Sequence, residues 1–533
     1  MKKNLIFLSL LLTSLVYGQK KLPDNWQTLD PAANNVMGTG AEEAYKTLEG
    51  KPSKTIIVGV IDSGVDPDHE DLKDIIWTNP GEIPDNGIDD DHNGYIDDVH
   101  GWSFLGGPNG DIADEASELA RIYQRLNKKF MHADTNHIAP DQLNEYNEFK
   151  KIRVTYLAEE LDKEQEYMSL QVVSGFLEKV KRTTPNGALT KETLNKYKPE
   201  IPLEAQLKRA FKLAFTLGMK PNEVESEIKE GMESTGKQIK LNTMNADSIR
   251  QYIVGDDLYN VNDRYYGNNH VKGPDALHGT HVSGIIAAIR NNGKGINGIA
   301  DNVKIMIIRA VPNGDERDKD IANGIRYAVD NGASIINMSF GKYYSPEKQA
   351  VDDAVKYAQS KNVLLIHASG NEMKNKDVED NYPTRKLLSG EVADNWMEIG
   401  AIASKKGKKV VAPFSNYGQH TVDVFAPGLE IYSTIPDNKY INESGTSMAA
   451  PSATGAAALV LQYFPDLKPQ QLKDLLIHTA VPYSGNVNVP GQSKKRLFKK
   501  LGKKPVRQRF NTLSVSGGFI NANNAVKELL HKK

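Results

Sequence analysis

The sequence contains no cysteine among its 533 residues. No disulfide bond can therefore reinforce the fold, and no cysteine can carry the lipid of a lipoprotein. The chain also lacks an excess of charge of either sign, because its formal net charge is −2, so nothing suggests nucleic acid or an anionic membrane as a partner. Beyond the N-terminus no apolar run is long enough to cross a bilayer, so we expect no membrane insertion. Hydrophobic residues make up 39% of the chain, which suffices for a folded core.

The N-terminus is typical of a secretory signal peptide. Lys2 and Lys3 precede the apolar stretch 5–16, and the small residue Gly18 follows shortly after it. A basic start, a short apolar segment and a small residue at its end form the pattern of a cleaved export signal. We therefore expect residues 1–18 to be removed and the mature chain to be exported, either to the periplasm or outside the cell.

One serine lies in a setting that suits a nucleophile. Ser447 belongs to the run Gly-Thr-Ser-Met-Ala-Ala-Pro, residues 445–451, at the start of an apolar helical segment that continues to Phe464. A hydroxyl in the first turn of a helix lies near free backbone N–H groups, and the small residues Gly445 and Ala449 leave room for a substrate. A serine in this position could also be a simple helix cap. As a nucleophile it would need a histidine to take its proton and a carboxylate to orient that histidine.

Both of these partners are present upstream. The apolar run 56–61 ends in Asp62, the pattern of a buried parallel strand that places a carboxylate at its C-terminal end. His278 precedes the small and apolar residues 279–286, so we expect it at the start of a buried helix. His281, in the same motif, is better explained as a structural residue. Taken alone, Asp62 could also close a turn.

In the order Asp62, His278 and Ser447, these segments resemble the catalytic triad of the subtilisin-like serine peptidases, or subtilases. A fourth segment agrees with the resemblance, because Asn371 in the run Ala-Ser-Gly-Asn-Glu follows the apolar residues 363–366. In the family this asparagine donates its side-chain amide to the oxyanion, together with the backbone N–H of the serine. Separate structural explanations exist for each residue, but together they would require four coincidences.

The resemblance covers roughly residues 55–105 and 265–480 and implies a serine endopeptidase that hydrolyses peptide bonds through an acyl-enzyme. It implies protein or peptide substrates and no organic cofactor, and it leaves the oligomeric state open. We expect the pocket for the side chain before the cut to be broad and largely apolar. By resemblance, the substrate backbone and this side chain are bound by Ser339, Phe340, Gly341, Ala368, Ser369 and Gly370.

The order of apolar and amphipathic segments independently predicts an α/β fold. Apolar runs with helical stretches between them indicate a doubly wound, mostly parallel sheet with helices on both faces. The expected helices include residues 320–331 and 347–361. The expected strands are 56–61, 303–308, 334–338, 363–366, 398–402 and 422–425.

A long insertion separates Asp62 from His278, which are 216 residues apart, far more than in compact members of the family. Its composition shifts to Lys, Glu, Leu and Asn with helical periodicity, and it is either a packing embellishment or a lid or exosite that restricts substrates. Helices are expected near 114–132, 141–182, 190–197, 203–217 and 221–233. The predicted division is a signal peptide at 1–18, an N-terminal extension at 19–54, the catalytic domain at 55–113 and 251–533, and the helical insertion at 114–250.

An acidic loop at residues 85–98 predicts a structural calcium site. It contains Asp-x-Asp-x-Asn-Gly-x-x-Asp, and the glycine of this pattern allows a sharp turn. The loop departs from an EF-hand because His100 stands where the bidentate glutamate would be, so Asp97 or Asp98 must complete the ligand shell. An ordinary Asp-rich turn is the alternative, although such a loop would repel itself without a cation. The expected ligands are Asp89, Asp91, Asn93, the carbonyl oxygen of Tyr95 and Asp97.

Two other functions are less consistent with these motifs. A catalytically inactive binding protein is disfavoured, because all four catalytic positions are filled. An esterase of the α/β-hydrolase class would carry its triad in the order Ser, Asp, His and would have a Gly-x-Ser-x-Gly elbow. The segment 445–449 lacks the second glycine, and His278 lies upstream of the serine.

Overall fold

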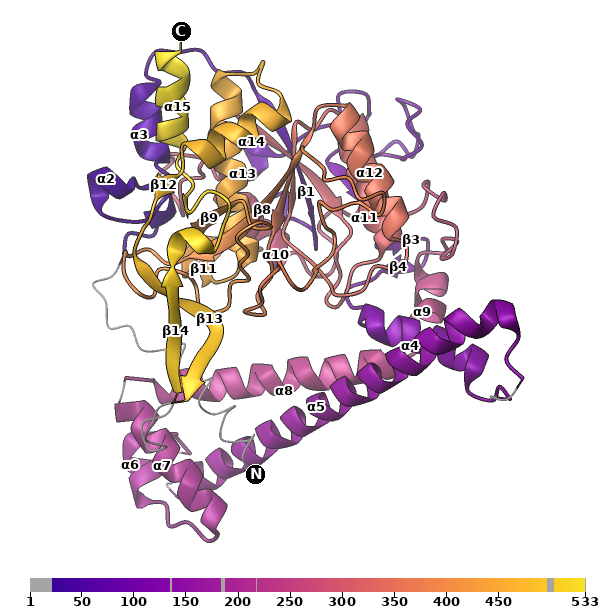
Figure 1. Ribbon diagram of the computed structural model, residues 1–533, viewed down its shortest axis with the longest axis vertical. Coiled ribbons are helices and arrows are strands. Elements are labelled where there is room, and N and C mark those ends of the chain that lie inside the picture. Colours follow the sequence, from indigo (N-terminus) through magenta and orange to yellow (C-terminus); the bar gives the residue numbers. More distant parts are fainter. Residues whose placement is uncertain (1–21, 135–136, 184–186, 217, 496–502, 533) are drawn as a thin grey trace. The chain divides into compact units, whose positions relative to one another are not determined.

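The segments that are apolar on both faces form a central sheet in a computed structural model, which describes residues 22–134, 137–183, 187–216, 218–495 and 503–532 (Figure 1). Within these residues the sheet has nine strands in the order β12-β15-β9-β8-β7-β6-β1-β5-β2, and all neighbours run parallel except β12 and β15. The strands are β1 (Ile56–Asp62), β2 (Gly101–Ser103), β5 (Val303–Arg309), β6 (Ile335–Met338), β7 (Leu364–Ala368), β8 (Trp396–Ile402), β9 (Val424–Pro427), β12 (Val481–Pro482) and β15 (Gly518–Phe519).

Helix pairs cover both faces of this sheet (Figure 1). Helices α10 (Leu277–Ala287) and α13 (Thr446–Tyr463) pack against each other and against the central strands. Helices α11 (Asp318–Asp330) and α12 (Lys348–Ser360) form a second pair, whose apolar residues share one core with strand residues such as Ile61 and Ile336. The sheet is therefore wound on both sides, and the fold class predicted from the sequence is confirmed.

Shorter elements complete this part of the molecule. Helices α3 and α15 pack against each other, and strand β10 packs against α10. These elements are α2 (Pro31–Asn34), α3 (Ala41–Thr47), α14 (Pro469–His478), α15 (Ala522–His531), β3 (Gly106–Gly107), β4 (Gly110–Asp111), β10 (Ile431–Ile435), β11 (Lys439–Glu443), β13 (Asn486–Lys495) and β14 (Lys503–Arg509).

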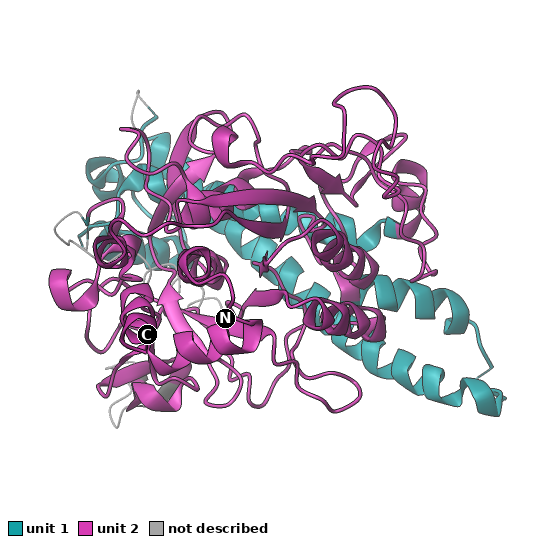
Figure 2. Ribbon diagram, turned by 90° about the horizontal axis from the view of Figure 1, so that it is seen from above, with its two compact units in different colours: residues 1–22, 119–246 teal, residues 23–118, 247–533 magenta. Residues whose placement is uncertain are grey.

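The chain separates into two compact units (Figure 2). We call residues 23–118 and 247–533 the sheet unit and residues 119–246 the helical unit. The helical unit has its own apolar core, which includes Phe176, Phe211 and Phe215. The helices of this unit and its boundaries are α4 (Glu118–Phe130), α5 (Leu143–Lys181), α6 (Lys191–Lys196), α7 (Pro202–Thr216), α8 (Pro221–Thr243) and α9 (Ala246–Ile253).

Two features of the helical unit differ from the expectation. Helix α8 continues to Thr243, ten residues beyond its predicted end at 233, and α9 follows it as a helix that was not predicted. Gly231 and Gly236 lower the intrinsic helix propensity of α8, so its last ten residues were not predicted to be helical. In the structure the Gly236 backbone meets the ring of Tyr167 on α5, so tertiary packing outweighs this low propensity.

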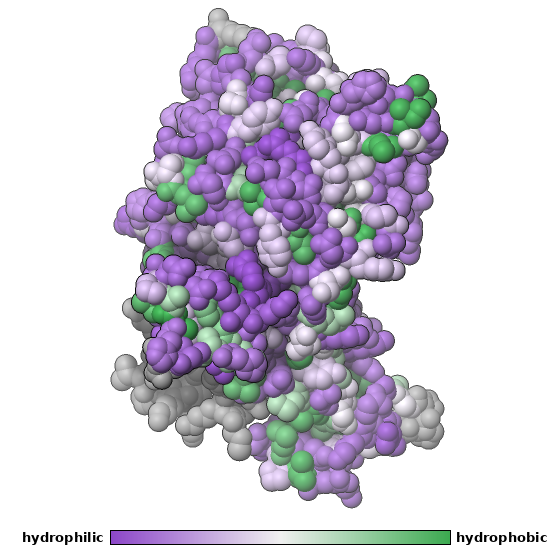
Figure 3. Space-filling view, turned by 90° about the vertical axis from the view of Figure 1, so that its right-hand side faces the viewer, coloured by the Kyte–Doolittle hydropathy of each residue, from purple (hydrophilic) through white to green (hydrophobic). Residues whose placement is uncertain are grey.

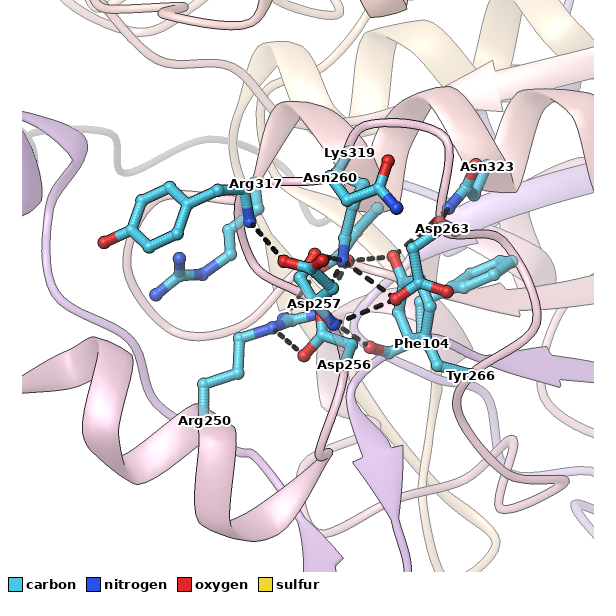
Figure 4. Close-up of polar contacts among 12 residues, drawn as sticks. Phe104, Arg250, Asp256, Asp257, Asn260, Asp263, Tyr266, Arg317, Lys319 and Asn323 are labelled. Atoms are coloured by element: carbon cyan, nitrogen blue, oxygen red, sulfur yellow. Dashed lines mark hydrogen bonds and ion pairs between the residues drawn. The ribbon is translucent and has the colours of Figure 1, made fainter.

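A buried ion-pair network fixes the chain where it returns from the helical unit (Figure 4). The Arg250 guanidinium lies 2.9 Å from an Asp256 oxygen and 2.7 Å from an Asp320 oxygen, and the Tyr266 hydroxyl donates to Asp320 at 2.6 Å. Burial alone would raise the pKa of Asp256, but Arg250 and Lys319 outweigh it and lower this pKa. Buried charges are stable only when they are paired in this way, so residues 250–266 are held against the first turn of α11.

A second arginine joins the two ends of the insertion within the sheet unit. Arg317 Nη2 lies 3.1 Å from a carboxylate oxygen of Glu115 and 2.9 Å from one of Asp247. Glu115 precedes α4, and Asp247 is the second residue of α9. The segments that lead into and out of the helical unit are therefore bound to the same side chain.

The surface seen in Figure 3 is mostly hydrophilic, with hydrophobic side chains in small groups. Among the described residues, no helix combines the length and the apolar character needed to cross a bilayer. The predicted signal peptide, residues 1–18, lies outside the described part of the chain.

Candidate active site

One candidate catalytic residue and two candidate substrate-binding residues lie at the carboxyl ends of adjacent strands. Asp62 is the last residue of β1, Ser339 follows β6, and Ser369 follows β7. Strands β1, β6 and β7 are consecutive in the sheet and parallel. Parallel strands that end together form an edge where α/β proteins bind ligands, and this edge collects the polar side chains of the site.

Asp62 and His278 are joined by a short hydrogen bond. The Nδ1 atom of His278 lies 2.7 Å from Oδ1 of Asp62, which is 1% exposed and also accepts the backbone N–H of Ser63. His278 is the second residue of α10, as predicted. Gly279 beside it permits this approach, because a Cβ atom there would clash with the carbonyl oxygen of Gly64.

The electrostatics of this pair suit a general base. Desolvation alone would lower the pKa of His278, but the charge of Asp62 and the hydrogen bond to it outweigh desolvation, so the pKa lies above its usual value. The side chain of His278 is 38% exposed, so it remains accessible from solvent. The carboxylate therefore orients the imidazole and favours its protonated form.

Ser447 lies in the first turn of α13, where its hydroxyl is held by a neighbouring strand end. Its Oγ donates to the carbonyl oxygen of Ser339 at 3.1 Å, while Ser339 Oγ donates to the carbonyl oxygen of Ser447 at 2.9 Å. Within the described residues no hydrogen bond joins Ser447 to His278. Apo active sites often show such geometry, and rotation about the Ser447 side-chain bond would redirect the hydroxyl.

The side-chain amide of Asn371 is held through its oxygen, which leaves its N–H groups as possible donors in the same region. Its Oδ1 accepts from the backbone N–H of Thr446 at 2.8 Å and from the Thr446 hydroxyl at 3.0 Å. A Cβ atom built on Gly445 would lie 3.5 Å from the Ser447 nitrogen and 3.6 Å from Nδ2 of Asn371. Two N–H donors therefore border one small space beside Ser447, which is the arrangement that an oxyanion requires. Sequence reasoning missed Thr446, which orients the asparagine.

Comparison with known proteins identifies the family. The model of the subtilase family of peptidases matches residues 53–510. The chain belongs to the subtilase family. The family membership predicted from the four motifs is thus confirmed.

Individual relatives of this subtilase cover only part of it. It is 42% identical to a thermophilic serine proteinase of Bacillus sp. (strain AK1) over 184 residues, which are 34% of this chain and 42% of that protein. It is 37% identical to Subtilisin DY of Bacillus licheniformis over 207 residues, which are 38% of this chain and 70% of that protein. The chain thus spans less than half of the first relative's length.

Lys342 holds the candidate substrate edge of this subtilase, residues 339–341, in place through buried ion pairs. Its Nζ lies 2.8 Å from Glu118 and 2.9 Å from Asp318, and it also donates to the carbonyl oxygen of Glu316 at 2.7 Å. Lys342 directly follows Gly341, the last residue of the predicted edge. The edge is thereby fixed to the first turns of α4 and α11.

A polar side chain that sequence reasoning missed lies between the two walls of the predicted pocket. Asn381 is 2% exposed, and its Oδ1 has no hydrogen-bond partner. A Cβ atom on Gly341 would overlap this oxygen, and one on Gly370 would lie 3.3 Å from Nδ2. Gly370 also has φ of +100°, a conformation that favours glycine. The residues of the predicted pocket therefore lie beside an amide, a polar group that the expectation of a largely apolar pocket did not include.

A buried charged cluster lies next to Ala368, Ser369 and Gly370, the predicted pocket wall. His367 Nδ1 lies 3.1 Å from Glu398, which also binds Lys376 and accepts from the Trp396 indole at 2.9 Å. Burial would raise the pKa of Glu398, but Lys376 and His367 lower it to about 2. The carboxylate therefore stays charged and ties three segments together under the site.

The carboxylates that converge near the acidic loop overlap only in part with the predicted calcium ligands. The carboxylate of Asp89 accepts the N–H groups of Asn93 and Gly94, and that of Asp97 accepts those of Asn86 and Gly87, so both close backbone turns. Neither joins the carboxylates that converge. The convergent carboxylates are those of Glu82, Asp91 and Asp98, whose oxygens lie within 4.8 Å of one another.

Proposed function

We propose that this subtilase is an exported serine endopeptidase that cleaves proteins through an acyl-enzyme intermediate. The observation that carries the proposal is the hydrogen bond between Asp62 and His278 at the sheet edge where Ser447 begins α13. An isolated buried Asp–His pair could be structural, but here the neighbouring strand β6 is followed by Ser339, whose carbonyl oxygen binds the Ser447 hydroxyl, and two N–H donors lie beside that serine. The four parts together are those needed for acyl transfer.

In this mechanism His278 acts as the general base. The Ser447 hydroxyl turns from the Ser339 carbonyl toward His278, loses its proton to the imidazole and attacks the peptide carbonyl. Asp62 stabilises the imidazolium that forms. The imidazolium then gives its proton to the leaving amine, and a water molecule activated by the same histidine releases the acyl group.

The developing oxyanion would be bound by Asn371 Nδ2 and the Ser447 backbone N–H. Thr446 holds the Oδ1 side of the amide, which leaves its N–H groups directed toward the reacting carbonyl. Donors positioned before the reaction cost no reorganisation when the charge forms. The backbone at 339–341 and 368–370 would pair with the substrate on either side of its reacting residue.

We also propose a structural calcium ion at the acidic loop, held by Glu82, Asp91 and Asp98. Glu82 is 8% exposed and its Oε2 has no hydrogen-bond partner, and burial raises the pKa of Asp98 to about 6. Three convergent carboxylates with an orphaned oxygen fit a hard cation. A bound calcium ion would neutralise their repulsion and rigidify the loop. Only Asp91 is common to this set and the set expected from the sequence.

Export of the protein is the remaining part of the proposal. It rests on the basic and apolar pattern of residues 1–18. Expression of the full chain followed by N-terminal sequencing of the secreted product tests it. A new N-terminus near residue 19 is expected, and an intact N-terminus would contradict the proposal.

Casein hydrolysis by the purified protein and its Ser447→Ala variant tests the enzymatic function. The variant should lose turnover by a factor on the order of 10⁶, because the nucleophile is gone while the fold is unchanged. Ser444→Ala is the matched control, since that hydroxyl only accepts the N–H of Glu430. Cleavage that survives in the Ser447 variant would contradict the serine mechanism.

A chelator that lowers thermal stability in the wild type, but not in Glu82→Gln, would support the calcium site.

A further inference from the structure

An apolar stripe runs along one exposed face of α5 in the helical unit. Its residues lie between 48% and 71% exposed and are spaced so that they fall on one side of a helix. Ile152, Tyr156 and Leu170 lie on the opposite side and are buried, where α5 packs against α8. We call the following residues the α5 stripe: Leu143, Val154, Leu157, Leu161, Met168 and Val172.

The α5 stripe is too long to be incidental. It extends over 30 residues, which is about 44 Å of helix at 1.5 Å per residue. Isolated exposed apolar residues are normal on protein surfaces, but an extended row of them marks an interaction surface. Three polar residues on the same face, Asn147, Lys150 and Gln165, interrupt this row. None of the stripe residues belongs to the apolar core of the helical unit, so the unit closes its own core without them.

Four charged residues beside the stripe are separated by sign along α5, with the positive pair N-terminal to the negative pair. Lys151 and Arg153 lie in the N-terminal half of α5, and Asp162 and Glu164 lie in the centre. All four are exposed, and none forms an ion pair with another described residue. By helical geometry Lys151 and Asp162 border one side of the stripe, while Arg153 and Glu164 border the other. Of these four residues, one positive and one negative group therefore lie on each border.

We propose that the protein forms a homodimer in which two α5 helices pair antiparallel about a twofold axis between Leu157 and Ala158. This register places Val154 against Leu161 of the partner subunit and Leu143 against Val172 of the partner subunit. It also brings Lys151 to the partner's Asp162 and Arg153 to the partner's Glu164, because antiparallel helices face each other with matching borders. A parallel pair in register would instead oppose like charges. Twofold symmetry makes every one of these contacts occur twice.

Site-directed crosslinking tests the register. The chain has no cysteine, so Ala158→Cys in the full-length Ser447→Ala protein creates one thiol per chain beside the proposed axis without self-cleavage. Mild oxidation should convert most of it into a disulfide-linked dimer. Lys212→Cys, an exposed position on α7, is the matched control and should stay monomeric. An Ala158→Cys protein that stays monomeric after oxidation would overturn the proposal. A reactive thiol would show that no partner thiol lies beside it, and an unreactive thiol would show that this face of α5 is covered by its own chain.

Charge reversal tests the pairing by sedimentation or light scattering across a wide range of concentration. Lys151→Glu alone and Asp162→Lys alone should each weaken the dimer about tenfold, because each variant replaces two attractive pairs with two repulsive ones. The double variant should recover the wild-type dissociation constant. Lys212→Glu should have no effect. Failure of the double variant to recover, with circular dichroism showing intact helices, would overturn the proposed register.

Discussion

The sheet unit and the helical unit differ in the contacts that stabilise each of them internally. In the sheet unit, buried carboxylates such as Asp62, Asp320 and Glu398 each have defined partners from distant segments. In the helical unit the core is an apolar cluster, and several ion pairs join neighbouring turns, as between Glu178 and Lys181. Substitution of these carboxylates in the sheet unit should therefore alter chemistry or charge, whereas substitution in the apolar core of the helical unit should alter packing.

The largest expected effect tests the chemical side of this comparison. Asp62→Asn should lower kcat about 10⁴-fold, because the amide no longer stabilises the imidazolium or holds the required tautomer. In the wild type the raised pKa of His278 keeps the imidazole protonated to higher pH, so kcat/KM should fall on the acid side at a pH above the ordinary histidine value. Removing the Asp62 charge should move this limb to lower pH. A pH profile measured with a short peptide checks the direction, and an unmoved limb would contradict it.

A packing change in the helical unit should lower its stability and leave peptide hydrolysis nearly unchanged. Phe215→Ala should destabilise the helical unit by roughly 3–5 kcal/mol, since this side chain is 1% exposed in its apolar core. Hydrolysis of a short peptide should remain close to the wild-type rate. Hydrogen exchange of the two units, measured together with activity, separates the outcomes. Equal loss of protection in both units would mean that they unfold as one.

The oxyanion donor gives a smaller chemical effect. Asn371→Ala should lower kcat by about 10²–10³ with little change in KM, because its amide acts only when the charge develops. Thr446→Val should cost less, since it removes one of the two groups that orient the amide and leaves the amide itself. Steady-state kinetics on both variants decides this. A larger loss for Thr446→Val than for Asn371→Ala would contradict the assigned roles.

The smallest effect concerns acid stability. The pKa of Glu398 falls from 4.5 to about 2, so its ion pairs stabilise the fold fully above pH 4.5 and lose that contribution as the pH falls through about 2. The shift corresponds to about 3 kcal/mol of stability. Unfolding midpoints across this range should decline less steeply in Glu398→Gln than in the wild type. Identical slopes would show that the carboxylate does not titrate as described.

The same contrast explains what the sequence could predict. Asp62, His278 and Ser447 each lie at an end of an element, so a local apolar run and a following small residue suffice to position them. Helices of the insertion were likewise visible from their periodicity. These predictions needed only short segments of the chain.

Contacts between distant segments were not predictable in this way. Asn381 meets Gly341 only because the backbones of Lys342 and Tyr382 exchange two hydrogen bonds. Glu82 and Asp98 approach Asp91 through a fold of the acidic loop, while the regular spacing of Asp89 and Asp97 suggested a different shell. Alternation within a motif predicts the kind of ligand, but which oxygens converge depends on turns that the motif does not specify.

The Arg317 contact to Glu115 and Asp247 has a consequence for the history of the chain. Because the two ends of the insertion are already held by one guanidinium of the sheet unit, the intervening residues are not needed to bring them together. Such a site can accept, exchange or lose an entire segment in a single genetic event while the surrounding sheet unit keeps its shape. The same property makes it a natural point at which to graft a foreign module.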